Sequence, residues 1–259
     1  MMSSRVKTGS RELDVMLNGG FLRGDAVLLA GSAGTGKTTL ALQYLVSGAE
    51  SGEPGIYLTF EELPDQLYRD AKSFGWDLSR LEEENKLRVI CTSPDVVVEP
   101  SGAELILQEP IKEIGARRIV IDSLSHLSMY VKPEEMRREM YRLVMFFKTK
   151  GLSSVLLWES PQMSGESFTV SAEGMSFLVD AIVLLKYVEI QSSIRSAMTI
   201  LKLRGSRHDR RLREFQIGDS GVKVLAPFDD YEGIMTGNPR KSGMEAISKG
   251  FAEAFKKRK

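Results

Sequence analysis

The sequence predicts an α/β fold, with a mostly parallel central sheet flanked by helices and a C-terminal antiparallel extension. Two patterns lead to this fold class. Short apolar segments alternate with helical segments between Asp25 and Glu159, and strand-like segments with short turns follow Asp180. Alternating strands and helices form parallel sheets with right-handed crossovers, whereas strands joined by short turns pair in antiparallel fashion.

The first pattern defines five strands and four helices. Several of the strand segments are continuously apolar, which is typical of strands covered by helices on both faces. The expected strands are residues 27–30, 55–60, 87–91, 118–121 and 154–158. The expected helices between them are residues 37–51, 64–74, 102–114 and 133–150.

The second pattern extends the same sheet. The expected strands are residues 181–189, 197–204, 213–217 and 222–226. No linker interrupts the chain before them, so residues 1–241 are expected to form one domain. Residues 242–259 are expected to form a tail helix with an apolar face opposite basic side chains. We favour packing of this helix on its own subunit or a neighbour over binding to anionic lipid.

Composition is typical of a soluble globular protein. The 259 residues are 42% hydrophobic and 27% charged, which suits one large α/β domain with a substantial core. We find neither an apolar run long enough to span a bilayer nor a signal-peptide pattern near the N-terminus. The one cysteine, Cys91, lies in an expected strand and is expected to be a buried thiol. These features predict a cytoplasmic location and argue against a membrane partner.

Charge is unevenly distributed along the chain. The formal net charge is zero, but residues 240–259 carry seven Lys or Arg and two Glu, a net charge of +5. The remainder is therefore near −5. This balance argues against a generally basic body that binds nucleic acid.

The segment GSAGTGKT, from Gly31 to Thr38, fits the phosphate-loop pattern G-x-x-x-x-G-K-[ST] between a strand and a helix. Its glycines let backbone N–H groups surround a phosphate chain at a helix N-terminus. Lys37 can reach the β- and γ-phosphates, and Thr38 can join a Mg²⁺ shell. The alternative is a glycine-rich turn with an incidental lysine. The expected nucleotide-binding residues are Gly31, Ser32, Ala33, Gly34, Thr35, Gly36, Lys37, Thr38 and Thr39.

Acidic residues end two other expected strands. Asp122 follows the apolar residues 118–121, where it could hold Mg²⁺ through water opposite Thr38. Glu61 and Glu62 follow residues 57–60, and either could orient a water that attacks a γ-phosphate. The alternative for these glutamates is an acidic pair that favours the N-terminus of the next helix.

A basic run, residues 202–208, ends another expected strand. Alternation places Lys202 and Arg204 on one face, where two cations could clamp a phosphate. The alternative is a solvated edge strand.

These segments together resemble the KaiC-like branch of the RecA-type ATPases. The similarity covers nearly the whole chain except the tail and includes GSAGTGKTTLALQYL, YLTFEE, RIVIDSLS, LLKYVEI and ILKLRGSRHDRRLREFQI. The last three strings are not general phosphate-loop features, so the resemblance is specific. It implies a RecA-like fold, use of ATP/ADP with Mg²⁺, and a homohexameric ring with ATP between subunits.

The resemblance also implies roles for individual residues. Glu61 and Glu62 match the catalytic glutamates, and Asp122 matches the second nucleotide motif. Lys202 and Arg204 match residues that reach the γ-phosphate of the neighbouring subunit. The clock protein of this family phosphorylates an adjacent Ser-Thr pair, and the matching stretch here is Ser176-Phe177. Dual-site autophosphorylation is therefore not expected, whereas phosphorylation of Ser176 alone remains a hypothesis.

Three functions fit these observations. The first is an ATPase whose hydrolysis changes ring conformation and the binding of an unidentified protein partner. The second is a recombinase-type ATPase that acts on DNA in repair, but residues 151–185 contain no Lys or Arg, and residues 123–135 contain only Lys132. Because cations dominate contacts with DNA phosphates, these loops argue against a DNA partner. The third is a nucleotide-binding scaffold with negligible turnover.

Overall fold

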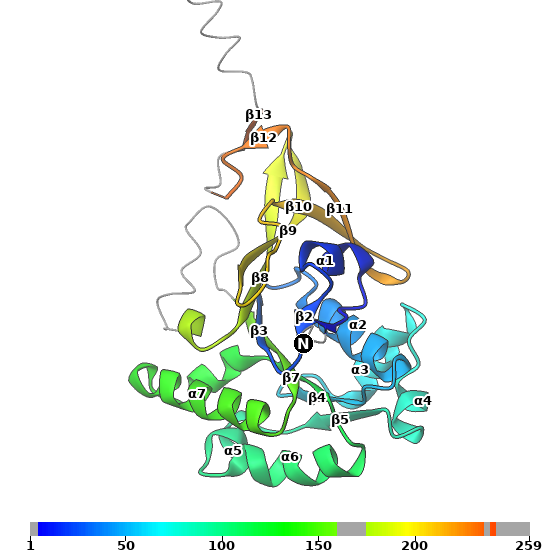
Figure 1. Cartoon of the computed structure of the whole chain (residues 1–259), viewed down its shortest axis with the longest axis vertical. Coiled ribbons are helices and arrows are strands. Elements are labelled where there is room, and N and C mark those ends of the chain that lie inside the picture. Colours follow the sequence, from blue (N-terminus) through cyan, green and yellow to red (C-terminus); the bar gives the residue numbers. More distant parts are fainter. Residues whose placement is uncertain (1–4, 160–174, 236–238, 242–259) are drawn as a thin grey trace, which may run out of the picture.

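The computed structural model describes residues 5–159, 175–235 and 239–241. Within these residues the main sheet has nine strands, in the order β11-β10-β9-β8-β3-β7-β6-β4-β5 (Figure 1). Their bounds are β3 Ala26–Gly31, β4 Gly55–Thr59, β5 Leu87–Cys91, β6 Arg118–Asp122, β7 Ser153–Glu159, β8 Ala181–Ile190, β9 Ser193–Leu203, β10 Arg213–Gly218 and β11 Gly221–Pro227.

The expected fold class is confirmed, with one difference in detail. Neighbouring strands in the part of the sheet ordered β8-β3-β7-β6-β4-β5 pair in parallel. The pairs β8–β9, β9–β10 and β10–β11 are antiparallel. The sequence placed β8 in the antiparallel extension, but β8 pairs in parallel with β3. The extension therefore begins at the β8–β9 hairpin, whose turn at Gln191 and Ser192 has positive φ angles.

Helices cover the sheet on both faces (Figure 1). One layer contains α1 Arg11–Met16, α2 Lys37–Glu50, α3 Pro64–Lys72 and α4 Leu78–Glu83. The other contains α5 Pro94–Val98, α6 Gly102–Glu113, the 3-10 helix η1 Leu124–Met129 and α7 Pro133–Thr149. The smaller elements are β1 Arg5–Val6, β2 Phe21–Leu22, the 3-10 helix η2 Met175–Phe177, β12 Tyr231–Glu232 and β13 Arg240–Lys241.

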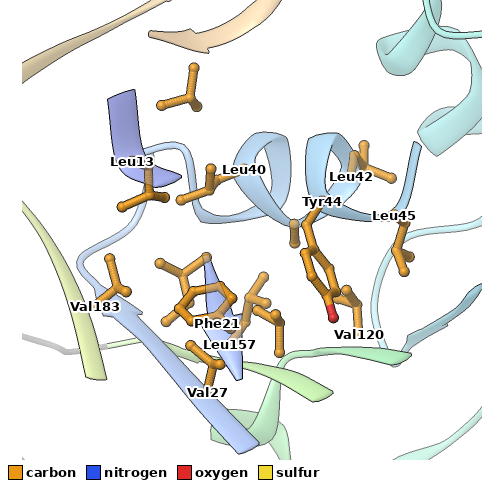
Figure 2. Close-up of a cluster of buried hydrophobic side chains, with 14 of the residues drawn as sticks. Leu13, Phe21, Val27, Leu40, Leu42, Tyr44, Leu45, Val120, Leu157 and Val183 are labelled. Carbon is orange, nitrogen blue, oxygen red and sulfur yellow. The ribbon is translucent and has the colours of Figure 1, made fainter. Parts of the chain in front are cut away.

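Strand β3 shows why the apolar segments form a central sheet. All six of its residues are buried. Val27 and Leu29 belong to the core beneath α2, whereas Leu28 belongs to the core beneath α7, as the alternation of side chains along a strand requires. Figure 2 shows Leu40 and Tyr44 of α2 above Val27 and its neighbours, so the helix that follows the phosphate-loop pattern packs directly on the sheet.

Three helices were not expected from the sequence. These are α1, α4 and α5, each five or six residues long, which is too short for an apolar periodicity to be recognised. The expectation of a buried Cys91 is also wrong. Cys91 is exposed because β5 is the edge strand of the sheet and Cys91 is its last residue.

A buried arginine joins the sheet to α2 and the N-terminal segment. Arg118, the first residue of β6, donates from Nη1 to the carbonyl oxygens of Lys7 at 2.8 Å and Tyr44 at 2.7 Å. Its Nε and Nη2 donate to the carboxylate of Glu53. The guanidinium lies 4.6 Å from the Tyr44 ring centroid and fills the space beside Gly48, where a Cβ would lie 2.4 Å from Nε. The sequence pattern identified this position only as the start of a strand.

None of the helices within the described residues combines the length and hydropathy that a transmembrane span requires. The expected tail helix of residues 242–259 lies outside the described residues.

Candidate functional site

Parallel pairing brings four strand ends to one edge of the sheet. Thr59 at the end of β4 pairs with Asp122 at the end of β6, and Gly31 at the end of β3 pairs with Glu159 at the end of β7. Ligands of open α/β sheets bind at this carboxyl edge. The register therefore places the phosphate-loop pattern next to acidic residues from two other strands.

The segment between β3 and α2 is a tight turn. Gly34 and Gly36 have φ angles of 75° and 87°, which side chains with a Cβ rarely adopt. The Thr35 hydroxyl donates to the carbonyl oxygen of Ser32 at 2.8 Å, and the Tyr187 hydroxyl of β8 donates to that of Gly34 at 2.6 Å. Gly36 caps α2, so the backbone N–H groups of the first turn point into the turn.

Lys37, the first residue of α2, is 7% exposed. Its ammonium donates to the carbonyl oxygen of Ser32 at 2.8 Å and lies 3.4 Å from Glu159 Oε2. The cation thus lies over the turn, with one protein carboxylate beside it. A phosphate bound in the turn would lie against the same ammonium.

Thr38 and Asp122 are in direct contact. The Thr38 hydroxyl donates to Asp122 Oδ2 at 2.8 Å, and the Tyr57 hydroxyl donates to the same oxygen at 2.5 Å. Burial raises the pKa of Asp122 above its usual value, although these two hydrogen bonds and Lys37 oppose the shift. Burial, and then the charge of Asp122, raises the pKa of Tyr57 well above its usual value, so the phenol remains a donor.

A hydroxyl and a carboxylate at this separation suit Mg²⁺, which usually takes one or two protein ligands together with waters and phosphate oxygens. The oxygen donors present therefore fit a magnesium ion shared with a bound nucleotide. Within the described ranges, three or more His, Cys, Asp or Glu side chains do not gather into a group that could hold a metal by itself.

Glu61 and Glu62 follow β4 on the same side of the site as Asp122. Their backbone N–H groups both donate to the Thr59 hydroxyl, at 3.3 and 3.0 Å, which fixes the turn after β4. Burial, followed by the charge of Asp122, raises the pKa of Glu62. Glu61 is more exposed, and its Oε2 lies 3.2 Å from Nε2 of His126.

These residues line one open hollow of about 350 Å³. Its lining consists of Gly34, Gly36, Lys37, Thr38, Thr39, Thr59, Glu61, Glu62, Asp122, Ser123, His126, Glu159 and Ile217. The structure therefore brings most of the expected phosphate-loop residues together with Asp122, Glu61 and Glu62.

The antiparallel extension also contributes to the hollow. Ile217 of β10 packs against Gly36, where a Cβ would lie 2.5 Å from Ile217 Cδ1. Gln43 of α2 donates to the carbonyl oxygen of Val222 at 3.3 Å and accepts from its N–H at 2.7 Å. The β10–β11 hairpin is therefore held on the helix that begins with Lys37.

Lys202 and Arg204 lie elsewhere. Lys202 donates to the carbonyl oxygens of Ser176 at 2.5 Å and Val179 at 2.6 Å, and Arg204 donates to that of Phe177 at 3.0 Å. Lys202 lies in β9 and Arg204 directly after its end, and both side chains contact the segment of residues 176–179. Burial, and then Arg204, lowers the pKa of Lys202. Neither residue lines the hollow of its own chain.

Sequence reasoning missed four side chains near the site: Tyr57, His126, Glu159 and Tyr187. Glu159 had a usable signal, because it ends an apolar strand in the same way as Asp122. The other three lie within strands or a short 3-10 helix, where the pattern gives no sign that the side chain faces a ligand.

Comparison with known proteins agrees with this geometry. The family model described as "ATPase: KaiC" matches residues 6–228. This chain belongs to the KaiC ATPase family.

Three KaiC relatives illustrate the similarity. The chain is 32% identical to the circadian clock protein KaiC3 of Synechocystis sp. over 95% of its length and 48% of that protein. It is 33% identical to the circadian clock oscillator protein KaiC of Thermostichus vulcanus, over 96% of the chain and 49% of the relative. It is 34% identical to KaiC of Parathermosynechococcus lividus, over 93% of the chain and 44% of that relative. The chain thus spans about half the length of the curated KaiC proteins that it matches.

Proposed function

We propose that this chain binds ATP with Mg²⁺ and hydrolyses it to ADP and phosphate. The observation that carries the proposal is the Thr38–Asp122 contact beside Lys37, at the carboxyl edge of a parallel sheet. A phosphate-binding turn, a cation and two oxygen donors for Mg²⁺ therefore lie within one hollow. Membership of the KaiC ATPase family supports ATP as the nucleotide.

Each residue has a distinct part in this proposal. The turn from Gly31 to Gly36 binds the phosphate chain through backbone N–H groups, and Lys37 neutralises the β- and γ-phosphates. Thr38 would hold Mg²⁺ directly and Asp122 through water, and the bound ion would offset the charge that develops on the phosphate oxygens.

Glu61 and Glu62 supply the carboxylates that orient the attacking water. The water oxygen forms a bond to the γ-phosphorus, the bond to the β–γ bridging oxygen breaks, and a carboxylate accepts the proton of the water. The two side chains differ in environment, since Glu62 is half-buried near Asp122 and Glu61 is exposed and contacts His126.

We further propose that hydrolysis takes place between subunits of a homo-oligomer, a hexameric ring by analogy with the family. Lys202 and Arg204 support this arrangement, because they lie together at the end of β9 and do not line the hollow of their own chain. They would act on the γ-phosphate held by a neighbouring subunit, and turnover would change ring conformation and partner binding. DNA is disfavoured as a partner by the scarcity of cations in residues 123–135 and 151–185.

Phosphate release measured together with molar mass in solution, with and without Mg·ATP, tests the proposal. The unaltered chain is expected to release phosphate and to assemble with nucleotide. Lys37→Ala is expected to lose ATP binding, and Glu61→Gln combined with Glu62→Gln to bind ATP without turnover. Negligible phosphate release by the unaltered chain, no greater than that of the double variant, would leave a nucleotide-binding scaffold as the better description. Substantial and equal release by the two proteins would remove the catalytic role of Glu61 and Glu62. Salt-dependent gel shifts with single- and double-stranded DNA test the recombinase alternative.

Three further proposals rest on the sequence. Residues 1–241 form the ATPase domain, with residues 242–259 as a separate tail helix, and limited proteolysis would test this division. Cell fractionation would test a cytoplasmic location. Ser176 is a candidate for autophosphorylation, and mass spectrometry after incubation with Mg·ATP would reject it if no phosphate were detected.

A further inference from the structure

Next to the proposed active site, three side chains form a series of two contacts. Ser123 Oγ lies 3.1 Å from Nδ1 of His126, and Nε2 of His126 lies 3.2 Å from Oε2 of Glu61. Ser123 follows β6, His126 lies in η1, and Glu61 follows β4. The contacts therefore join two turns that leave neighbouring strands of the sheet.

The two ends of this series of contacts, Ser123 and Glu61, differ in exposure to solvent. Ser123 is buried, and its carbonyl oxygen also lies near Nδ1 of His126, at 3.3 Å. The edge of the imidazole also faces the Phe60 ring, with 6.5 Å between ring centroids. The side chain of Glu61 is 76% exposed, and its ion-pair contact within the described part of the chain is with His126.

We propose that His126 is a positioning residue that holds Glu61 in its working orientation, an inference that rests on the proposed ATPase function. An exposed glutamate samples several rotamers, and fixing one costs conformational entropy at each turnover. A donor anchored through Ser123 removes that freedom before the nucleotide binds. Glu62 needs no such partner, because partial burial beside Asp122 already restricts it.

The series of contacts gives matched variants. In His126→Gln, the amide nitrogen takes a position close to that of Nε2, so the donor towards Glu61 is retained. In His126→Asn, the shorter amide can replace Nδ1 beside Ser123 but does not reach Glu61. His126→Ala removes both contacts. All three variants leave the ligands of the phosphates and of Mg²⁺ in place.

Steady-state kinetics distinguish positioning from a merely structural role. We expect His126→Ala and His126→Asn to lower kcat roughly ten-fold, because Glu61 loses the contact that orients it towards the attacking water, with KM for ATP changed less than about two-fold. His126→Gln is expected to keep kcat within about three-fold of the unaltered chain. Equal losses in the Gln and Asn variants would overturn the proposal, as would a higher kcat in His126→Ala.

A second measurement needs no turnover. The chain contains two histidines, His126 and His208, so imidazole ¹⁵N spectra are simple to assign with His208→Gln. Glu61→Gln is expected to shift the Nε2 resonance of His126, whereas the matched control Glu62→Gln leaves it in place. An unshifted resonance in Glu61→Gln would overturn the proposal.

Failure of the ATPase proposal and failure of the positioning role of His126 give different experimental results. If the ATPase proposal is wrong, the unaltered chain releases no phosphate, and the positioning role falls with it. If only the present inference is wrong, the unaltered chain releases phosphate normally while the Gln and Asn variants behave alike.

Discussion

The ammonium of Lys37 lies 3.4 Å from a carboxylate oxygen of Glu159. The two residues lie at the ends of neighbouring strands, since Glu159 ends β7 and Lys37 begins α2 after the turn that follows β3. Glu159 therefore occupies the side of the cation where a terminal phosphate would be expected to bind. We therefore expect this ion pair to open when a nucleotide binds.

We expect Glu159→Gln to bind ATP more tightly than the unaltered chain. Because the pair is partly exposed, its contribution is at most about 1 kcal/mol, which corresponds to roughly a five-fold lower Kd. Titration calorimetry with ATP and with ADP would measure the effect, which should be larger for ATP. Asp230→Asn removes one exposed charge away from the hollow and serves as the control. Weaker ATP binding by Glu159→Gln would mean that Glu159 assists the phosphate instead of competing with it.

Arg204→Ala is expected to fold and bind ATP but to hydrolyse it on the order of 100-fold more slowly, because a γ-phosphate loses a cation. Lys223→Ala, which removes an exposed cation from β11, is the control.

Mixing two inactive variants tests whether Arg204 acts between subunits. A preparation of Lys37→Ala with Arg204→Ala contains interfaces that combine an intact Lys37 from one subunit with an intact Arg204 from the next. Phosphate release should therefore partly recover in the mixture. Absence of recovery in mixed oligomers would assign Arg204 to its own subunit.

The buried Arg118 is expected to be important for stability. Arg118→Leu leaves Oε2 of Glu53 and two carbonyl oxygens without the donors that Arg118 supplies, so the free energy of unfolding should fall by about 3 kcal/mol. Denaturant unfolding would measure the change. The matched control is Arg88→Leu on edge strand β5, whose ion pair with Glu113 is partly exposed and should contribute less than about 1 kcal/mol. Similar losses in the two variants would contradict the special role of Arg118.

Asp25 should make the protein less stable as the pH rises. Burial and the neighbouring charge of Asp180 raise the pKa of Asp25 from 3.8 to about 6. The folded state then binds more protons than the unfolded state between these values, so the free energy of unfolding falls as the pH rises from about 4 to about 6.

Asp25→Asn imitates the protonated carboxyl and is expected to remove this slope. After allowance for solvent screening, it should raise the free energy of unfolding at pH 7 by about 1 kcal/mol. Thermal unfolding followed across pH 4–7 would measure both effects. An unchanged slope in Asp25→Asn would assign the pH dependence to other groups.

Much of the fold and part of the site could be predicted from the sequence, for physical reasons that particular residues illustrate. The run before Gly31 is continuously apolar because β3 is covered on both faces, and such strands are easy to recognise. Asp122 and Lys37 belong to a local pattern with a specific chemistry. The burial of Cys91 was wrongly predicted because it depends on strand order. Strand order decides whether a strand lies at the edge of the sheet, and no local segment of the sequence determines it.

The remaining features depend on contacts between distant segments. Tyr57 is a strand residue with no local sign of its bond to Asp122, which is 65 residues away. The Glu61–His126 contact likewise requires β4 and β6 to be neighbours in the sheet. Sequence periodicity gives the face of an element, whereas the pairing of elements determines which polar side chains meet.

The two hydrogen bonds between Gln43 and Val222 have a consequence for synthesis of the protein. The phosphate-binding turn is translated early, but the hairpin that supports Gly36 and Gln43 leaves the ribosome almost 180 residues later. A nascent chain therefore carries an unsupported turn through most of its translation. We therefore expect any nucleotide binding to be gained late, once residues 217–222 have emerged.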